Sequence, residues 1–148
     1  MSYSRKTVRD ALASLLNTAL TGTGKPAQAV YGYQVGDFQG QSPVVIVTSA
    51  GSERDQLTMA TRRTSHFHLN IHILVLNADP SSGWTEAMAE DALDTIEQLV
   101  DQTLAANLVT TTWRDVAYDG RSTVINVALG GSDYRYELIP VAIAVTHD

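Results

Sequence analysis

The chain has 148 residues, of which 44% are hydrophobic and 18% charged, and its formal net charge is −6 at pH 7. This length and composition predict one compact domain over residues 1–148 and exclude an intrinsically disordered chain. The absence of cysteine excludes disulfide scaffolds, zinc ribbons and thiol nucleophiles, and the negative charge opposes binding of nucleic acid by charge neutralisation.

The first half of the chain predicts one helix and two strands. Apolar residues recur at helical spacing over residues 7–19, where Thr7 is a suitable N-cap. A short strand is expected at 29–33, and the β-branched stretch 42–49 predicts a strand that is covered on both faces. Residues 50–64 are expected to form a long polar loop, and loops of this length are usually functional or poorly ordered.

The second half begins with the clearest strand of the sequence. Polar and apolar residues alternate over 65–76, which predicts one polar and one apolar face. Thr85 then caps a helix that continues to residue 104 with one apolar stripe. Three further strands are expected at 112–118, 123–129 and 134–146, separated by turns that contain glycine.

The predicted order of elements is therefore α-β-β-β-α-β-β-β. This order is typical of an α+β domain with a mainly antiparallel or mixed sheet of about six strands. The two helices are amphipathic, so we expect both to pack on one face of that sheet. The longest apolar stretches are too short to cross a bilayer, and no membrane partner is expected.

Three histidines share the polar face of the strand predicted at 65–76. His66, His68 and His72 are separated by even numbers of residues and therefore project from the same side. One strand offers two metal ligands at best, fewer than a closed zinc site requires, so no metal site is expected. The face is expected to contact water or another subunit. A subunit contact here would weaken as the histidines become charged below about pH 6.5.

The predicted helix at 85–104 carries a row of carboxylates without a basic residue between them. Glu90, Asp94, Glu97 and Asp101 follow one another at steps of four, three and four, which places them on one side of the helix. The row is compatible with a solvated face, with a wall that meets basic residues of a neighbour, or with the lining of a channel. An acidic channel wall repels phosphates, so DNA would slide past it without adhering.

The basic residues are concentrated in the other part of the chain. Residues 1–65 contain seven basic and four acidic side chains, a balance of +3, whereas residues 66–148 contain three and twelve, a balance of −9. The loop predicted at 50–64 contributes three arginines with possible apolar anchors, and arginine and methionine are enriched where proteins dock. These candidate interface residues are Arg54, Leu57, Met59, Arg62 and Arg63.

Several stretches of the chain match a known family in order. They are TVRDALASLLNTAL, SPVVIVTSAGSERDQ, HFHLNIHILVL, WTEAMAEDALDTIEQLV and YRYELIPVAIAV. With these stretches, which span nearly the whole chain, the sequence resembles the tail terminator, or tail-tube completion, proteins of long-tailed bacteriophages. The match rests on pattern and on short phrases, without a catalytic signature.

The resemblance implies a structural role in the virion. Proteins of that family are α+β subunits that form a hexameric ring on the last turn of the tail tube. The ring ends tube polymerisation, offers a surface to the neck proteins below the capsid portal, and lets DNA pass. The implied partners are therefore further copies of the chain, the tube protein and a neck or head-completion protein. The implied location is the head-proximal end of the tail, after assembly in the host cytoplasm.

Two alternatives remain open at the level of the sequence. Other phage neck or tail-completion (head–tail joining) proteins have a similar size and order of elements. A small cytosolic enzyme or metal-binding protein would use the histidine face and the acidic helix instead. The family implies no catalytic residue and no cofactor, and no motif in the sequence supplies a complete catalytic set.

Overall fold

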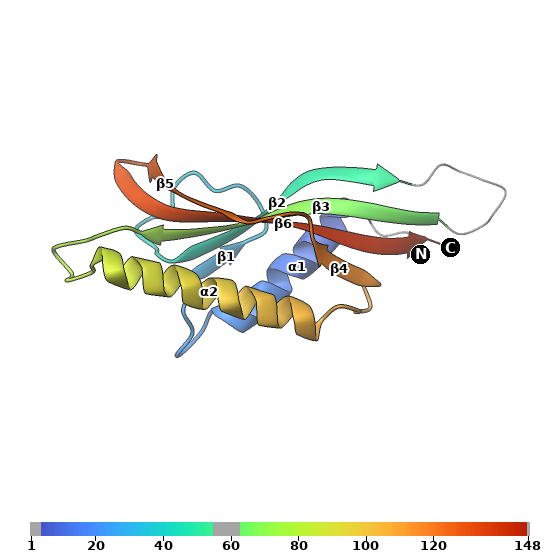
Figure 1. Ribbon diagram of the computed structural model, residues 1–148, viewed down its shortest axis with the longest axis horizontal. Coiled ribbons are helices and arrows are strands. Elements are labelled where there is room, and N and C mark those ends of the chain that lie inside the picture. Colours follow the sequence, from blue (N-terminus) through green and yellow to red (C-terminus); the bar gives the residue numbers. More distant parts are fainter. Residues whose placement is uncertain (1–3, 55–62, 148) are drawn as a thin grey trace.

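The computed structural model describes residues 4–54 and 63–147, which form two helices and a six-stranded mixed sheet (Figure 1). The predicted α+β class and the predicted order of elements are confirmed. In chain order, the elements are α1 (Arg5–Leu20), β1 (Ala29–Tyr31), β2 (Val44–Arg54), β3 (Arg63–Leu76), α2 (Glu86–Ala106), β4 (Asp115–Tyr118), β5 (Thr123–Leu129) and β6 (Ser132–His147).

The sheet is built around the long antiparallel pair of β3 and β6. The strand order is β1-β2-β3-β6-β4, and β5 also pairs with β6. Strand β1 runs parallel to β2, and the other pairs are antiparallel. Because β3 pairs with one side of β6 from Tyr134 to His147, β4 and β5 share the other side, one after the other.

Pro140 of β6 lies where this shared side changes from β5 to β4. Its carbonyl oxygen accepts a hydrogen bond of 2.9 Å from the amide of Asp119, which follows β4. The N and O of one residue point to the same side of a strand, so the missing N–H of Pro140 falls in the gap between the two short strands. Proline is tolerated in a sheet at such an interruption, where no ladder hydrogen bond is lost.

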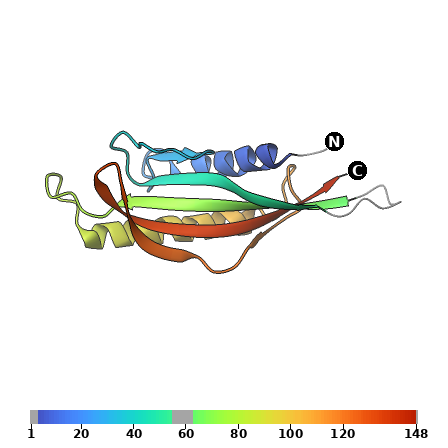
Figure 2. The ribbon, with the colours of Figure 1, turned by 90° about the horizontal axis from the view of Figure 1, so that it is seen from above.

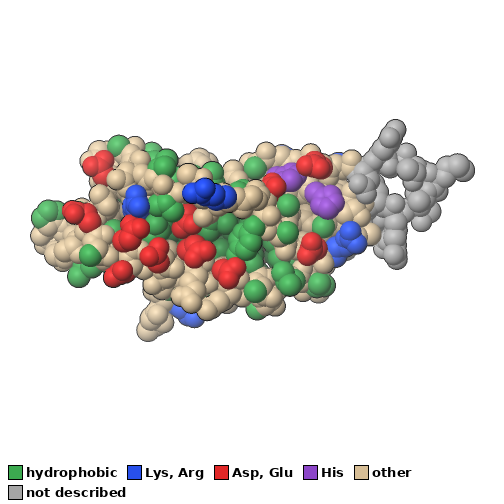
Figure 3. All heavy atoms as spheres, viewed as in Figure 1, with side chains coloured by type: hydrophobic (Ala, Val, Ile, Leu, Met, Phe, Trp, Pro, Cys, Tyr) green, Lys and Arg blue, Asp and Glu red, His purple; other side chains and the backbone are tan. Residues whose placement is uncertain are grey.

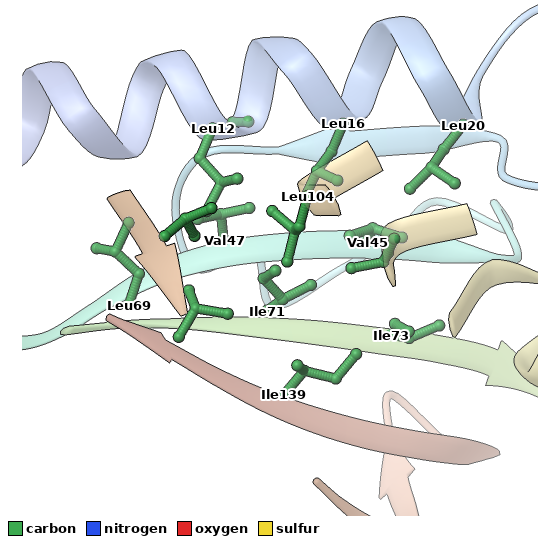
Figure 4. Close-up of a cluster of buried hydrophobic side chains, with 14 of the residues drawn as sticks. Leu12, Leu16, Leu20, Val45, Val47, Leu69, Ile71, Ile73, Leu104 and Ile139 are labelled. Carbon is green, nitrogen blue, oxygen red and sulfur yellow. The ribbon is translucent and has the colours of Figure 1, made fainter. Parts of the chain in front are cut away.

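Both helices pack on one face of the sheet and form the main core with it (Figures 1 and 2). Alternate residues of β2, β3 and β6 point to the helices, and the apolar stripes of α1 and α2 close over them. Burial of each large aliphatic side chain stabilises the fold by about 1.5–3 kcal/mol. Among the core side chains that point toward one another in Figure 4 are Leu12, Leu16, Leu20, Val45, Val47, Leu69, Ile71, Ile73, Leu104 and Ile139.

The opposite face of the sheet has a smaller apolar cluster at one end. Phe38, in the segment between β1 and β2, packs against Tyr134 edge to face, with 5.5 Å between ring centroids. Val44 and Ile46 of β2 join this cluster, whereas Val45 and Val47 join the main core. The prediction that residues 42–49 form a strand covered on both faces is therefore confirmed for its apolar centre.

Two predicted boundaries are wrong for local reasons. Helix α1 begins at Arg5 because Ser4, and not Thr7, is its N-cap; the Ser4 side-chain oxygen accepts from the Thr7 amide. The predicted loop at 50–64 is too long, since β2 continues to Arg54 and β3 begins at Arg63. Polar residues fit this extension because the two strands satisfy each other's backbone groups there while many side chains stay exposed.

A test of the core is the replacement of Ile96, which is fully buried in α2, by aspartate. An unpaired carboxylate at this position is expected to lower the free energy of unfolding by about 4 kcal/mol or more. Gln98→Asp places the same charge on the exposed side of the same helix and should change it by less than about 1 kcal/mol. Urea unfolding followed by circular dichroism measures both; equal losses would contradict the assigned core.

Candidate functional site

The candidate interface residues of the predicted 50–64 loop fall into two groups. Leu57, Met59 and Arg62 lie outside the described residues. Arg63 belongs to β3, where its backbone pairs with that of His147. Arg54 is the last residue of β2 and therefore part of the sheet, a correction to its predicted position in a loop. Its side chain is packed locally, as described next.

The Arg54 guanidinium covers an aromatic residue of the neighbouring strand. Its central carbon lies 5.2 Å from the centroid of the Phe67 ring, and its Nη1 donates to the Ser65 hydroxyl at 3.4 Å. A cation over an aromatic face is attracted by the quadrupole of the ring. Arg54 thus covers the Phe67 ring at the end of the core. The residue as a whole is exposed to solvent.

The three histidines lie on the face of β3 that points away from the helices, as the alternation predicted. They do not form one uniform polar surface. His72 is held between neighbouring strands: its Nε2 lies 2.8 Å from Thr48 Oγ1 and its Nδ1 lies 2.6 Å from the Tyr136 hydroxyl. Burial lowers the pKa of His72, so its neutral form is favoured in the folded chain.

His68 has two carboxylates as partners. Its Nδ1 lies 2.6 Å from Asp119 Oδ2 and its Nε2 lies 3.0 Å from Glu53 Oε1. Burial disfavours the charged ring, but the hydrogen bonds to Asp119 and Glu53 together outweigh it and raise the pKa of His68. In its protonated form the ring donates from both nitrogens and is a charged bridge that links β2, β3 and the end of β4.

These partners change the interpretation of the histidine face. The pKa values of His68 and His72 move in opposite directions, so the two rings do not become charged together. Within residues 4–54 and 63–147, no group of three or more His, Asp or Glu side chains is placed to hold a metal ion. The partners come from other strands, and only the register of the sheet reveals them.

The four predicted carboxylates of α2 lie along the side of the helix that faces β6 and β4. We call Glu90, Asp94, Glu97 and Asp101 the acidic row. At one end, Glu90 pairs with Arg135 of β6, with Arg135 Nε 2.8 Å from Glu90 Oε2. At the other end, the Tyr118 hydroxyl of β4 donates to Asp101. Figure 3 shows acidic side chains gathered over this helix.

A buried carboxyl group lies beside the acidic row. The Glu137 side chain of β6 is on the helix-facing side of the sheet, and the residue is only 4% exposed. Burial raises its pKa, and so does the charge of Glu97, Asp94 and Glu90, while a hydrogen bond with Ser122 opposes the shift. We did not single out Glu137 from the sequence, although the alternation of β6 already places it on the face of Ile139.

The outer edge of β5 is a further feature that the sequence analysis did not assign to a site. All seven residues of β5 are uncharged, and the strand pairs on one side only, with β6, within the described part of the chain. Val124, Ile125 and Leu129 are 39%, 47% and 37% exposed. An exposed, uncharged edge strand is a template for pairing with another chain.

An apolar groove continues this surface at the C-terminal end of α2. It has a volume of about 300 Å³ and lies between α2 and β4. Asp101 of the acidic row borders it, and its other walls are Leu104, Ala105, Leu108, Val116, Ala117 and Tyr118. An apolar centre with a charged border is the usual composition of a protein–protein interface.

Comparison with known proteins adds no family. No protein-family model matches the chain, and no curated protein sequence matches it significantly. Among the described residues, neither helix is long and apolar enough to cross a membrane. The candidate site is therefore defined by the chain itself: the acidic row, the outer edge of β5 and the groove beside β4.

The charged bridge at His68 predicts a pH-dependent contribution to stability. A raised histidine pKa stabilises the fold fully below the ordinary value of about 6.5, and this contribution is lost as the pH rises through the raised value. The loss of stability caused by His68→Gln should therefore be larger at pH 6 than at pH 9. Urea unfolding at both pH values measures it, with His66→Gln as the control; a loss independent of pH would contradict the bridge.

The buried carboxyl group predicts the opposite trend. Because the pKa of Glu137 is raised, its ionisation destabilises the fold as the pH increases above the ordinary glutamate value. Glu137→Gln keeps a hydrogen-bonding group for Ser122 and should raise the melting temperature at pH 7, with a gain that shrinks toward pH 4. Thermal unfolding across this range tests it. Asp94→Asn, at an exposed position, should give a smaller gain; a Glu137→Gln chain less stable than wild type at pH 7 would refute the assignment.

Proposed function

We propose that this chain is a structural subunit of a bacteriophage tail, which forms a ring that caps the tail tube. The observation that carries the proposal is the uncharged, exposed edge strand β5 next to the acidic row of α2. The resemblance of the sequence to tail terminator proteins supplies the identity of the assembly. The α+β order of the elements agrees with that resemblance.

The edge of β5 supports a subunit that works in an assembly. Proteins that function alone usually protect sheet edges with lysine, proline, bulges or a covering segment. Strand β5 has the sequence TVINVAL, which contains no charge and no proline, and three of its apolar side chains are more than one-third exposed. A second chain that pairs with this edge would satisfy its backbone groups and cover these side chains.

The charge of the chain is compatible with a ring through which DNA passes. With a net charge of −6, the surface repels phosphates overall and offers little non-specific affinity for DNA. In this proposal, the ring ends tube growth by occupying the last turn of the tube and presenting the neck protein with a different surface. Its partners are other copies of the chain, the tube protein and a neck protein.

Polymerisation of the tail-tube protein of the same phage tests this function. Added in increasing amounts, the chain should shorten the tubes seen by negative-stain electron microscopy, with a ring visible at one tube end. An equal amount of the Ile96→Asp chain controls for effects of unrelated protein. Tubes of unchanged length with wild-type protein would refute capping, and binding to a neck protein without an effect on tubes would favour another neck component.

The mass of the purified chain and its metal content separate this proposal from the enzymatic alternative. A ring of about six copies without bound metal is expected by light scattering and elemental mass spectrometry. Stoichiometric zinc in a stable monomer would instead favour a metal-binding protein.

A further inference from the structure

The two edges of the sheet, where its outermost strands lie, carry opposite charge. On one side lie β1 and α1, and α1 contributes Arg5, Lys6 and Arg9 against a single acidic residue, Asp10. We call β1 with these three basic residues the basic edge. On the other side lie β4, β5 and the acidic row, which we call the acidic edge. Figure 2 shows α1 and β1 along one side of the sheet and β5 along the other.

Arg5 and Lys6 of the basic edge are exposed, whereas Arg9 is partly buried and its Nε has no hydrogen-bond partner among the described residues. Arg5 donates to the Ser52 hydroxyl at 3.2 Å and Arg9 to the Ser49 hydroxyl at 3.1 Å, contacts with neutral groups that leave the guanidinium charge uncompensated. Lys6 pairs with Asp10, and the Lys6 side chain is still 75% exposed. The first two turns of α1 therefore present a net positive charge.

The acidic edge has an excess of negative charge that its own residues do not neutralise. Arg135 forms an ion pair with Glu90, and within the described part of the chain Glu97 and Asp94 lie close enough to raise the pKa of the buried Glu137. Like charges at this spacing destabilise the isolated subunit. A positively charged surface placed against the row would relieve that repulsion.

Given the ring of the proposed function, we infer that its copies associate head to tail, with the basic edge of one copy against the acidic edge of the next. Strand β5 of the first copy then extends its sheet with β1 of the second. Both helices lie on the same face of the sheet, so this junction places α1 of the second copy beside the acidic row of the first. The occupant of the acidic edge is thus a second copy of this chain.

Charge disfavours the other way of covering β5. A two-fold contact between two β5 strands would place two acidic rows side by side, and juxtaposed like charges are costly at an interface. A contact between different surfaces also has a consequence for symmetry, because each copy keeps one unused edge until the ring closes. The head-to-tail contact can therefore close into a ring, as the proposed function requires, whereas the two-fold contact would stop at a dimer.

Charge reversal tests the contact in the full-length chain. Asp94→Lys and Arg5→Glu should each raise the protein concentration needed for half-maximal assembly about tenfold or more, as measured by native mass spectrometry at low salt. Asp91→Lys makes the same change on α2 outside the acidic row, and Lys25→Glu reverses a basic residue beyond the C-terminal end of α1. Both controls should assemble like wild type.

The decisive chain carries both reversals. In Arg5→Glu/Asp94→Lys the residues at these two positions exchange their charges and stay complementary. The protein concentration needed for half-maximal assembly should therefore return most of the way to the wild-type value. Equimolar mixing of the two single variants should also restore rings. A two-fold contact predicts instead that Arg5→Glu assembles normally and that Asp94→Lys, which lowers the repulsion between the two acidic rows, assembles at a lower concentration than wild type.

Failure of the inferred contact can be distinguished from failure of the proposed function. If the wild-type chain forms rings and the variants behave as expected, but the rings do not shorten tubes, tube capping is refuted and the contact stands. A wild-type chain that stays monomeric at every concentration tested, or single reversals that do not weaken assembly, would overturn the inferred contact. Circular dichroism of each variant verifies that it folds; Arg5→Glu adds a carboxylate in the first turn of α1, where helices favour it.

Discussion

The pairing of β3 with β6 along fourteen residues is the constraint on which the rest of the structure depends. Successive side chains of each strand point to opposite faces, so this one ladder separates the face that the helices bury from the face that carries the histidines and the smaller apolar cluster. A shift of one residue would exchange the two faces and place His68 and His72 in the core. The apolar side chains of Phe67, Leu69 and Ile71 prevent such a shift, because they find a buried environment only in the observed register.

This division also determines where charge can be placed. Glu137 and Arg135 are on the helix-facing side because β6 alternates, and they meet the carboxylates of α2 there. The histidines of β3 meet partners from β2, β4 and β6 on the other side. One face is therefore stabilised mainly by packing under two helices, whereas the other combines a small apolar cluster with hydrogen bonds between strands.

Much of the fold could be predicted from periodicity. The stripe of α2, its Thr85 cap and the alternation of β3 are local signals, and each is present in the structure. Partners distant in sequence could not be predicted, because they depend on register. Asp119 lies fifty-one positions from His68, and nothing near either residue indicates their contact. The extension of β2 to Arg54 was missed for the same reason: its polar residues form a strand only because β3 pairs with them.

The gap at Pro140 affects how far another chain can pair with the exposed edge of the sheet. A long, uninterrupted, uncharged edge invites stacking of many chains into fibrils. Here the exposed border is divided at Pro140 into the seven residues of β5 and the four residues of β4. A strand that pairs with β5 therefore gains at most seven residues of ladder before it reaches the interruption. The interruption thus limits the length over which another chain can pair with this border.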